Sequence, residues 1–201
     1  MTRTLDDALR WTQQGTELFL DAVAYDGESL LPGWSRRHLA AHVAANGEAL
    51  GNLVHWATTG IPTPMYRSPE ARVADIERGI AMSPNDLDAW LRRSAATLIS
   101  SLRRMTPDHW ATEVVTAQGR TVPATDIPWL RAREVYVHAI DLDLGVTYAS
   151  LPDDFLEALC ADVLAKRGSV PHVDGPLAER AAWLTGRTHR LEGAPDLGPW
   201  L

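Results

Sequence analysis

Ionisable side chains form a stripe along one segment that is otherwise strongly apolar. Because they follow one another at steps of three or four residues, they share one face of a helix expected at residues 127–144. The remaining side chains of this segment are mostly apolar, which predicts that the helix is buried on most sides. A buried carboxylate or imidazole is unfavourable unless it is paired or binds a metal. The four residues of the stripe are Arg131, Glu134, His138 and Asp141.

The pair of Glu134 and His138 is the part of the stripe with the clearest chemistry. Four residues apart on a helix, a carboxylate and an imidazole can converge on one divalent ion. The same spacing allows a plain hydrogen bond between them, and Arg131 can neutralise Glu134 instead. Short motifs of this kind are common without any function, so the spacing alone leaves both interpretations open.

A second helix, expected at residues 35–60, carries two histidines at a spacing that also suits metal ligands. His42 lies on a face with small side chains and Asn46, which allow close helix packing or leave room for a ligand. His38 lies in a more polar neighbourhood, and only a partner elsewhere in the chain can decide between the two. We expect His55 and His109 to be surface or core-edge residues.

Nucleophilic catalysis by the chain's own cysteine is a poorer hypothesis. Cys160 is the one cysteine of the chain, and it lies in an amphipathic segment where a buried thiol is expected. A single cysteine also excludes an internal disulfide and a cysteine-rich metal site. The glycine-rich and serine-centred motifs of nucleotide-binding proteins and α/β-hydrolases are missing from the sequence. Any metal would therefore be held by His, Asp and Glu.

The composition bounds the class of protein. The chain has 201 residues, with 45% hydrophobic and 22% charged residues, as in a folded protein of one domain with room for a small appendage. Its formal net charge of -7 argues against non-specific nucleic-acid binding. The sequence shows no signal peptide and no apolar run long enough to span a membrane. We therefore expect a cytoplasmic protein with a reduced thiol.

Hydrophobic periodicity predicts a mainly helical chain. Short connections between long helices favour an antiparallel four-helix bundle at residues 1–148, followed by a small unit at residues 149–201. A Gln118-Gly119 turn between Trp110 and Val122 predicts a β-hairpin. Helices are expected at about residues 5–27, 35–60, 69–81, 84–105, 127–144, 152–166 and 177–186.

Two segments resemble the DinB-like superfamily of thiol-dependent metalloenzymes. They are Gly33-Trp-Ser-Arg-Arg-His-Leu-Ala-Ala-His-Val-Ala-Ala-Asn46 and Arg131-Ala-Arg-Glu-Val-Tyr-Val-His-Ala-Ile-Asp-Leu142. The segment from Asn52 to Glu77, which contains Thr-Gly-Ile-Pro-Thr-Pro-Met-Tyr, resembles the mycothiol-dependent maleylpyruvate isomerases in particular. The C-terminal Ala182-Trp-Leu-Thr-Gly-Arg187 is similar to the closing signature of that family, so the resemblance covers nearly the whole chain.

The resemblance implies a fold, a cofactor set and a metal site. The fold would be a DinB-like four-helix bundle with a C-terminal α/β unit, which is shortened here to a mainly helical remnant. The metal ligands would be His42, Glu134 and His138, holding zinc or another divalent ion. Mycothiol would be the thiol cofactor, and Arg187 would bind a substrate carboxylate.

The implied reaction is the cis–trans isomerisation of maleylpyruvate to fumarylpyruvate, a step of gentisate-type aromatic degradation. A thiolate from outside the protein adds to the double bond, the resulting single bond rotates, and the thiolate leaves. Asn46 and Arg131 are predicted to contact the bound cofactor or substrate, and Asp141 is a candidate partner for His138. The partners are then a dicarboxylate and a small thiol, without nucleic acid or membrane, for a monomer or homodimer.

Two other functions are compatible with parts of the pattern. A mycothiol S-transferase would share the metal triad and act on another electrophile, and the shortened C-terminal unit would fit a changed substrate. A zinc-binding regulatory module is the non-enzymatic alternative. Such a module would be expected to supply cysteine ligands, and Cys160 is far in sequence from the histidine motifs.

Overall fold

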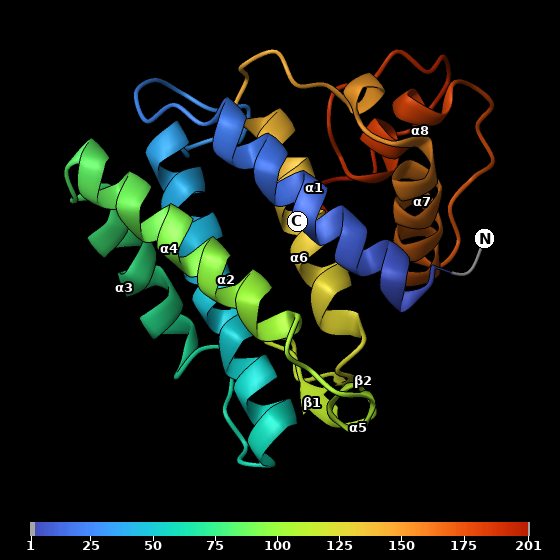
Figure 1. Cartoon of the computed structure of the whole chain (residues 1–201). Coiled ribbons are helices and arrows are strands. Elements are labelled where there is room, and N and C mark those ends of the chain that lie inside the picture. Colours follow the sequence, from blue (N-terminus) through green and yellow to red (C-terminus); the bar gives the residue numbers. More distant parts are fainter. Residues whose placement is uncertain (1–2, 201) are drawn as a thin grey trace. The chain divides into compact units, whose positions relative to one another are not determined.

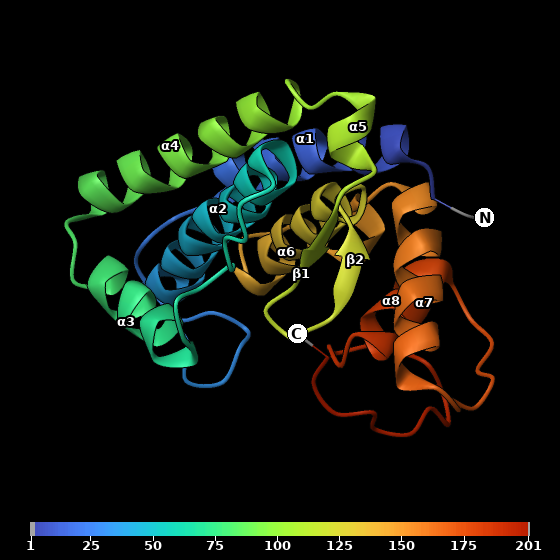
Figure 2. The ribbon, with the colours of Figure 1, turned by 90° about the horizontal axis from the view of Figure 1, so that it is seen from below.

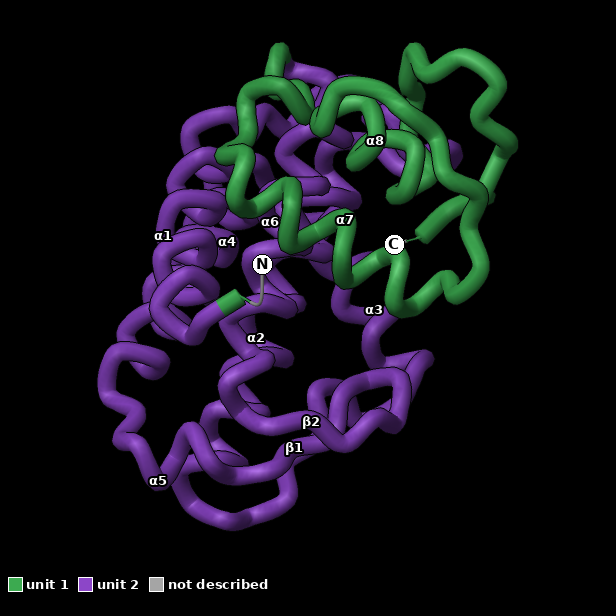
Figure 3. The backbone as a smooth tube through the Cα atoms, turned by 90° about the vertical axis from the view of Figure 1, so that its right-hand side faces the viewer, with its two compact units in different colours: residues 1–3, 145–201 green, residues 4–144 purple. Residues whose placement is uncertain are grey.

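The computed structural model describes residues 3–200, which form two compact units (Figure 3). The larger unit contains residues 4–144, and the smaller consists mainly of the described chain from residue 145 onward. The domain boundary predicted at residues 148 and 149 lies close to this division. Within the described residues, no helix is both long and apolar enough to cross a membrane.

Four long helices build the larger unit, as the sequence predicts (Figures 1 and 2). Of these four, the first packs mainly against the last, and the second packs against the third and the last. A further helix lies along the second, outside the bundle, and a two-stranded hairpin covers one end. The elements are α1 (Leu5–Ala22), α2 (Arg36–Thr59), α3 (Pro69–Ile80), α4 (Pro84–Leu102), α5 (Pro107–Trp110), β1 (Glu113–Val115), β2 (Thr121–Pro123) and α6 (Asp126–Asp141).

Helix boundaries follow capping chemistry. Thr4 and Asp7 form a reciprocal capping box at the start of α1. Helix α2 ends at Thr59 and is capped by Gly60, whose φ of 73° lies in the left-handed region that favours glycine. Helix α1 ends at Ala22 rather than at the predicted Gly27, because the chain turns away so that Tyr25 can donate a hydrogen bond to Asp88 of α4 at 2.7 Å.

Helix α6 is enclosed by the bundle, which confirms the burial that its apolar pattern predicts. Thr12 of α1 donates to the carbonyl oxygen of Pro128 at 2.6 Å. At Gly15 of α1, a Cβ atom would lie 2.8 Å from the side chain of Val135, so only glycine allows the two helices to approach this closely. The polar stripe of α6 is therefore held in a fixed position against its neighbours.

The hairpin expected between Trp110 and Val122 is present. Strands β1 and β2 pair antiparallel, with Val114 opposite Val122 and both side chains buried. Gly119 adopts a φ of 73° in the turn between the strands. The one-turn helix α5 before the hairpin was not predicted, because its proline-led sequence carries no hydrophobic period.

The smaller unit is helical, and its described residues from 145 onward contain no strand, as expected. It consists of the 3₁₀ helix η1 (Tyr148–Ser150), α7 (Asp153–Arg167) and α8 (Leu177–Leu184). The side chain of Arg167 donates to three backbone carbonyl groups, those of Leu184, Leu197 and Gly198. These bonds hold the glycine- and proline-rich tail against the two helices.

Candidate metal centre

Three ligand-type side chains from two helices meet inside the bundle. His42 lies in the middle of α2, and Glu134 and His138 lie one turn apart on α6. The Nε2 atom of His42 is 2.8 Å from Oε2 of Glu134, and Nε2 of His138 is 3.3 Å from the same oxygen. The three ligand atoms lie within 4.8 Å of one another, which is close enough for one ion to contact all three.

The side chains of Arg131 and Asn46 tie together the two helices that carry the triad. The Nη1 atom of Arg131 on α6 donates to the carbonyl oxygen of Val43 at 2.7 Å and to Oδ1 of Asn46 at 2.8 Å, both on α2. The Arg131 side chain is 1% exposed. Because Val43 directly follows His42 in the sequence, these bonds fix the position of His42 along the helix axis relative to Glu134.

Asp141 orients His138. Its Oδ2 atom lies 2.8 Å from Nδ1 of His138, and both groups are fully enclosed. A carboxylate in this place holds the proton on Nδ1 and directs Nε2 toward Glu134, which is the usual arrangement of a histidine ligand and its supporting carboxylate. The last member of the stripe therefore has a defined role in the geometry.

The protonation states of the triad follow from this hydrogen bonding. Burial opposes the charged form of His138, but the hydrogen bonds with Asp141 and Glu134 outweigh it and raise the pKa of His138 to about 9. Burial likewise acts against the Glu134 carboxylate, yet the hydrogen bonds from His138 and His42 bring its pKa well below the usual value. For His42, burial dominates and lowers the pKa.

Because its pKa is raised, His138 carries a proton on Nε2 in the metal-free protein, and this is the atom that would bind the ion. His42 is neutral and donates from Nε2 to Glu134, while its Nδ1 atom lies 3.4 Å from the guanidinium Nη2 of Arg72. An arginine can only donate, so Nδ1 of His42 is the acceptor in that contact. The carboxylate is ionised and both imidazoles face it, so the three side chains form the ligand set of a divalent cation once Nε2 of each histidine has lost its proton.

The structure separates His42 from His38, which the spacing alone could not do. Nδ1 of His38 accepts from the backbone N–H of Ser35 at 3.1 Å and lies 2.8 Å from its hydroxyl, so His38 caps the start of α2. His55 is exposed, as expected. His109 accepts from the backbone N–H of Thr106 at 3.2 Å and caps the short α5.

Comparison with known proteins assigns the chain that carries this site to a family. A family model described as the mycothiol maleylpyruvate isomerase N-terminal domain matches residues 3–143, which contain all three side chains of the triad. The chain belongs to the mycothiol-dependent maleylpyruvate isomerase family. Among curated proteins, none matches this chain.

Solved structures extend this similarity over the full length. The crystal structure of the mycothiol-dependent maleylpyruvate isomerase shares 34% sequence identity with this chain, with a TM-score of 0.91 and 100% of both chains covered. A mutant of the isomerase with a histidine replaced by alanine gives a TM-score of 0.90 at the same identity and coverage. The helical fold and the isomerase classification predicted from the sequence are therefore confirmed.

Two side chains beside the triad were missed in the sequence. Arg72 of α3 contacts His42, as described above, and its guanidinium carbon lies 6.0 Å from the centre of the Tyr66 ring. Burial and the nearby Glu134 charge raise the pKa of Tyr66, so its hydroxyl stays protonated. Both residues lie in the segment that resembles the isomerase family, but only the tertiary structure shows that they face the triad.

Two further residues of interest belong to the smaller unit. Arg187 donates from Nη1 to the carbonyl oxygen of Thr185 at 2.7 Å, and its role in substrate binding stays a prediction. Cys160 is buried, as expected, and burial raises the pKa of its thiol to about 11. A thiol that stays protonated near neutral pH is a poor nucleophile, so Cys160 does not replace an external thiol.

Proposed function

We propose that this protein is a metal- and mycothiol-dependent isomerase that converts maleylpyruvate to fumarylpyruvate, with His42, Glu134 and His138 as the ligands of a zinc ion. The convergence of these three side chains on one point carries the proposal. Two histidines and one carboxylate suit zinc, and three protein ligands leave a coordination position open. The relatives' dependence on mycothiol and the inert Cys160 support a thiol that comes from outside.

The chemistry of the isomerisation needs a reversible nucleophile rather than a net transfer of atoms. Zinc held by His42, Glu134 and His138 would lower the pKa of a bound thiol and so supply the thiolate that reversible addition to the double bond requires. The roles of the chain are to hold the ion, to orient the substrate and to stabilise the charge that moves onto the carbonyl oxygen during addition.

Positive charge for the dianionic substrate comes from arginines, since the chain carries a formal net charge of -7. Arg72 is partly exposed and lies beside His42, so its guanidinium is placed to bind a substrate carboxylate. Arg187 is the second proposed carboxylate ligand. Tyr66, whose hydroxyl stays protonated, would donate a hydrogen bond to the developing enolate.

Asn46 and Arg131 are proposed to support the bound thiol and substrate from the side of α2. Arg131 keeps its charge in spite of burial, which lowers its pKa to about 10. Arg131 precedes Glu134 by three residues on α6, and its Nη1 atom donates to both Val43 and Asn46. This arrangement keeps the amide of Asn46 in one orientation and adds a fixed positive charge behind the triad.

The test is the conversion of maleylpyruvate by zinc-loaded protein, measured with and without mycothiol. We expect isomerisation that requires the thiol and leaves its concentration unchanged. Consumption of the thiol would indicate an S-transferase instead, and conversion without thiol would contradict the proposal. His42→Ala should lose bound zinc and activity together, whereas the matched variant His38→Ala, four residues away on the same helix, should keep both.

A further inference from the structure

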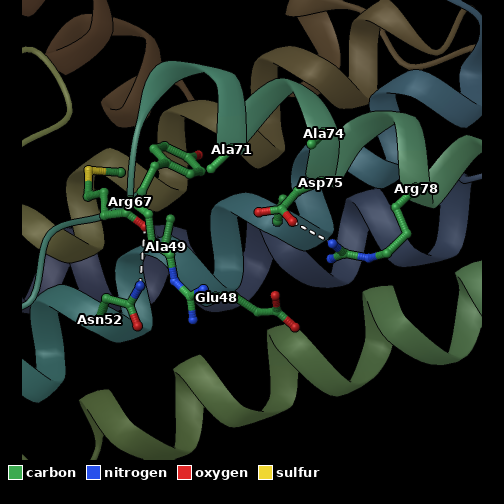
Figure 4. Close-up of a pocket in the computed structure, with 11 residues that line it drawn as sticks. Glu48, Ala49, Asn52, Arg67, Ala71, Ala74, Asp75 and Arg78 are labelled. Carbon is green, nitrogen blue, oxygen red and sulfur yellow. Dashed lines mark hydrogen bonds and ion pairs between the residues drawn. The ribbon is translucent and has the colours of Figure 1, made fainter.

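A pocket of about 570 Å³ lies between α2 and α3 (Figure 4). Its volume is within the range of sites that hold a whole small molecule. Alanines from both helices line it, among them Ala45 and Ala49 of α2 and Ala74 of α3. Larger side chains at these positions would fill the space, so the pocket exists because the residues are small.

Contacts at both ends keep the pocket open. At Gly79 of α3, a Cβ atom would lie 2.5 Å from the side chain of Ala41, so the two helices touch at this end. At the other end, the amide of Asn52 on α2 donates to the carbonyl oxygens of Pro64 at 3.3 Å and Met65 at 3.2 Å. The segment before α3 is therefore fastened to α2, and the space between the two contacts cannot close easily.

The lining is polar and balanced in charge. Glu48 accepts a hydrogen bond from Nε1 of Trp90 at 2.7 Å, and Asp75 pairs with Arg78, while each carboxylate keeps lone pairs for further donors. Arg67 adds a second positive charge, and Tyr66 contributes an aromatic ring. The carboxylates disfavour a dianion such as the substrate, and the many polar groups disfavour an apolar ligand. A neutral ligand rich in hydroxyl groups fits this lining best.

Two side chains, Tyr66 and Arg72, link the pocket with the candidate metal centre. Ala45 follows His42 by three residues, which is about 4.5 Å along the helix axis, and Asn52 lies about 15 Å from His42 in the same direction. Tyr66 lines the pocket and also lies within electrostatic range of Glu134. Arg72 contacts both Tyr66 and His42. A molecule with one end at the triad would therefore extend its other end into this pocket.

We propose that the pocket between α2 and α3 binds the sugar part of the thiol cofactor. Mycothiol joins an N-acetylated cysteine to a glucosamine–inositol unit, which is uncharged and rich in hydroxyl groups. The proposal rests on the proposed function, because it takes the thiol end to lie at His42, Glu134 and His138. Glu48, Asn52 and Asp75 then bind hydroxyl groups, and the sugar part distinguishes mycothiol from smaller thiols.

Calorimetric titration of the zinc-loaded full-length protein tests this assignment with two thiols. N-acetylcysteine carries the thiol end alone, and mycothiol carries the sugar part in addition. Ala74→Trp places a large side chain in the pocket from an exposed position of α3, so the fold should tolerate it. The matched control is Val73→Trp, because Val73 is its neighbour on α3, is 54% exposed and does not line the pocket.

The expected result is that Ala74→Trp weakens mycothiol binding at least about tenfold and leaves N-acetylcysteine binding and zinc content unchanged. Val73→Trp should bind both thiols like the wild type. Equal binding of mycothiol by Ala74→Trp and wild type, equal weakening by both variants, or a wild type that binds both thiols equally well would overturn the pocket assignment alone. A wild type that binds neither thiol would contradict the proposed function itself.

Discussion

Two arginines, one in each unit of the molecule, differ in how completely their guanidinium groups are hydrogen-bonded. In the smaller unit, Arg167 donates from Nε to Leu184 at 2.9 Å, from Nη1 to Leu197 at 2.6 Å and from Nη2 to Gly198 at 2.8 Å. In the larger unit, Arg131 uses Nη1 alone, while its Nε and Nη2 atoms are buried without a hydrogen-bond partner among residues 3–200.

The difference follows from what each region has to do. The tail after α8 has little regular structure, so side-chain hydrogen bonds to its carbonyl groups replace the missing backbone ladder. The candidate metal centre instead collects ionised groups, which are unfavourable when buried unless they are paired or bind a metal. Arg167 donates from all three of its guanidinium nitrogens and acts as a structural residue, whereas we propose that Arg131, with two nitrogens unpaired within the described part of the chain, serves the candidate site.

The closing signature at residues 182–187 contains residues with structural roles. The hydroxyl of Thr185 lies 2.5 Å from that of Tyr148 and donates to the carbonyl of Ala181 at 2.8 Å. Gly186 has a φ of 70°, and a Cβ atom there would lie 2.3 Å from the carbonyl oxygen of Gly198. Thr185 and Gly186 therefore stabilise the smaller unit, and within this segment a role in substrate binding is proposed for Arg187 alone.

The largest effect is expected from neutralising the shared carboxylate of the metal centre. Glu134→Gln removes the negative charge that faces both histidines, so the variant should lose zinc and at least about a thousandfold in isomerase activity. Metal analysis and the isomerase assay measure the two quantities. Arg167→Met is the control in the other unit, and it should keep its zinc; loss of zinc from that variant would remove the distinction between site and scaffold.

The pH dependence of zinc binding should come next in size. The metal-free protein holds a proton on His138 up to its pKa of about 9, and zinc must displace this proton. The apparent affinity should therefore rise by about tenfold per pH unit between pH 7 and pH 9 and level off above it. Competition titrations with a chelator measure this slope, and an affinity independent of pH over that range would show that His138 is not a ligand.

The raised pKa of His138 should make the metal-free protein less stable as the pH rises, whereas zinc binding should become stronger over the same range. A group whose folded pKa lies above its ordinary value of 6.5 contributes stability below that value and loses it as the pH rises through about 9. Metal-free protein should thus unfold more easily at pH 9 than at pH 7. Zinc-loaded protein should not show this loss, because the bound ion replaces the proton.

Removal of the carboxylate that supports His138 should have a smaller effect than removal of a ligand. Asp141→Asn keeps the shape but not the charge, and it should lower zinc affinity about 10- to 100-fold with a parallel loss of activity. Chelator competition distinguishes this from Glu134→Gln, which should not bind zinc at all. An Asp141→Asn variant with wild-type affinity would mean that the hydrogen bond to His138 has no part in metal binding.

The smallest effect is expected on the free energy of unfolding, for which the two arginines can be compared directly. Arg167→Met leaves three carbonyl groups without their donors and should lower the free energy of unfolding by about 2 kcal/mol. Arg131→Met in zinc-loaded protein should cost less, because few hydrogen bonds are lost and the ion still balances Glu134. Urea unfolding curves measure both values, and a larger loss for Arg131→Met would show that its role is structural.

Much of the fold was predictable because helices are local. Capping residues and apolar spacing place α2, α3, α4, α6, α7 and α8 close to their observed bounds, and a turn sequence places the hairpin. The end of α1 was wrong because it depends on the contact between Tyr25 and Asp88, which are distant in the sequence. The one-turn elements α5 and η1 carry too little pattern to predict.

The candidate metal centre, like the fold, was predictable from the sequence only in part. The sequence by itself determines that Glu134 and His138 face the same side of a buried helix, because their spacing matches one helical turn. The sequence does not decide whether His38 or His42 is the third ligand, because both are histidines on the same helix. The resemblance to the family chose His42, and the fold gives the physical reason: one histidine meets α6, and the other caps its own helix.

Only the tertiary structure decided which charges surround the triad. Arg131 could have neutralised Glu134 along α6, but it reaches across to Val43 and Asn46 instead. Arg72 and Tyr66 come to the site because α3 packs on α2, a contact between segments that no local pattern links. Periodicity fixes the face of a helix on which a side chain lies, whereas its partners depend on how the helices pack against each other.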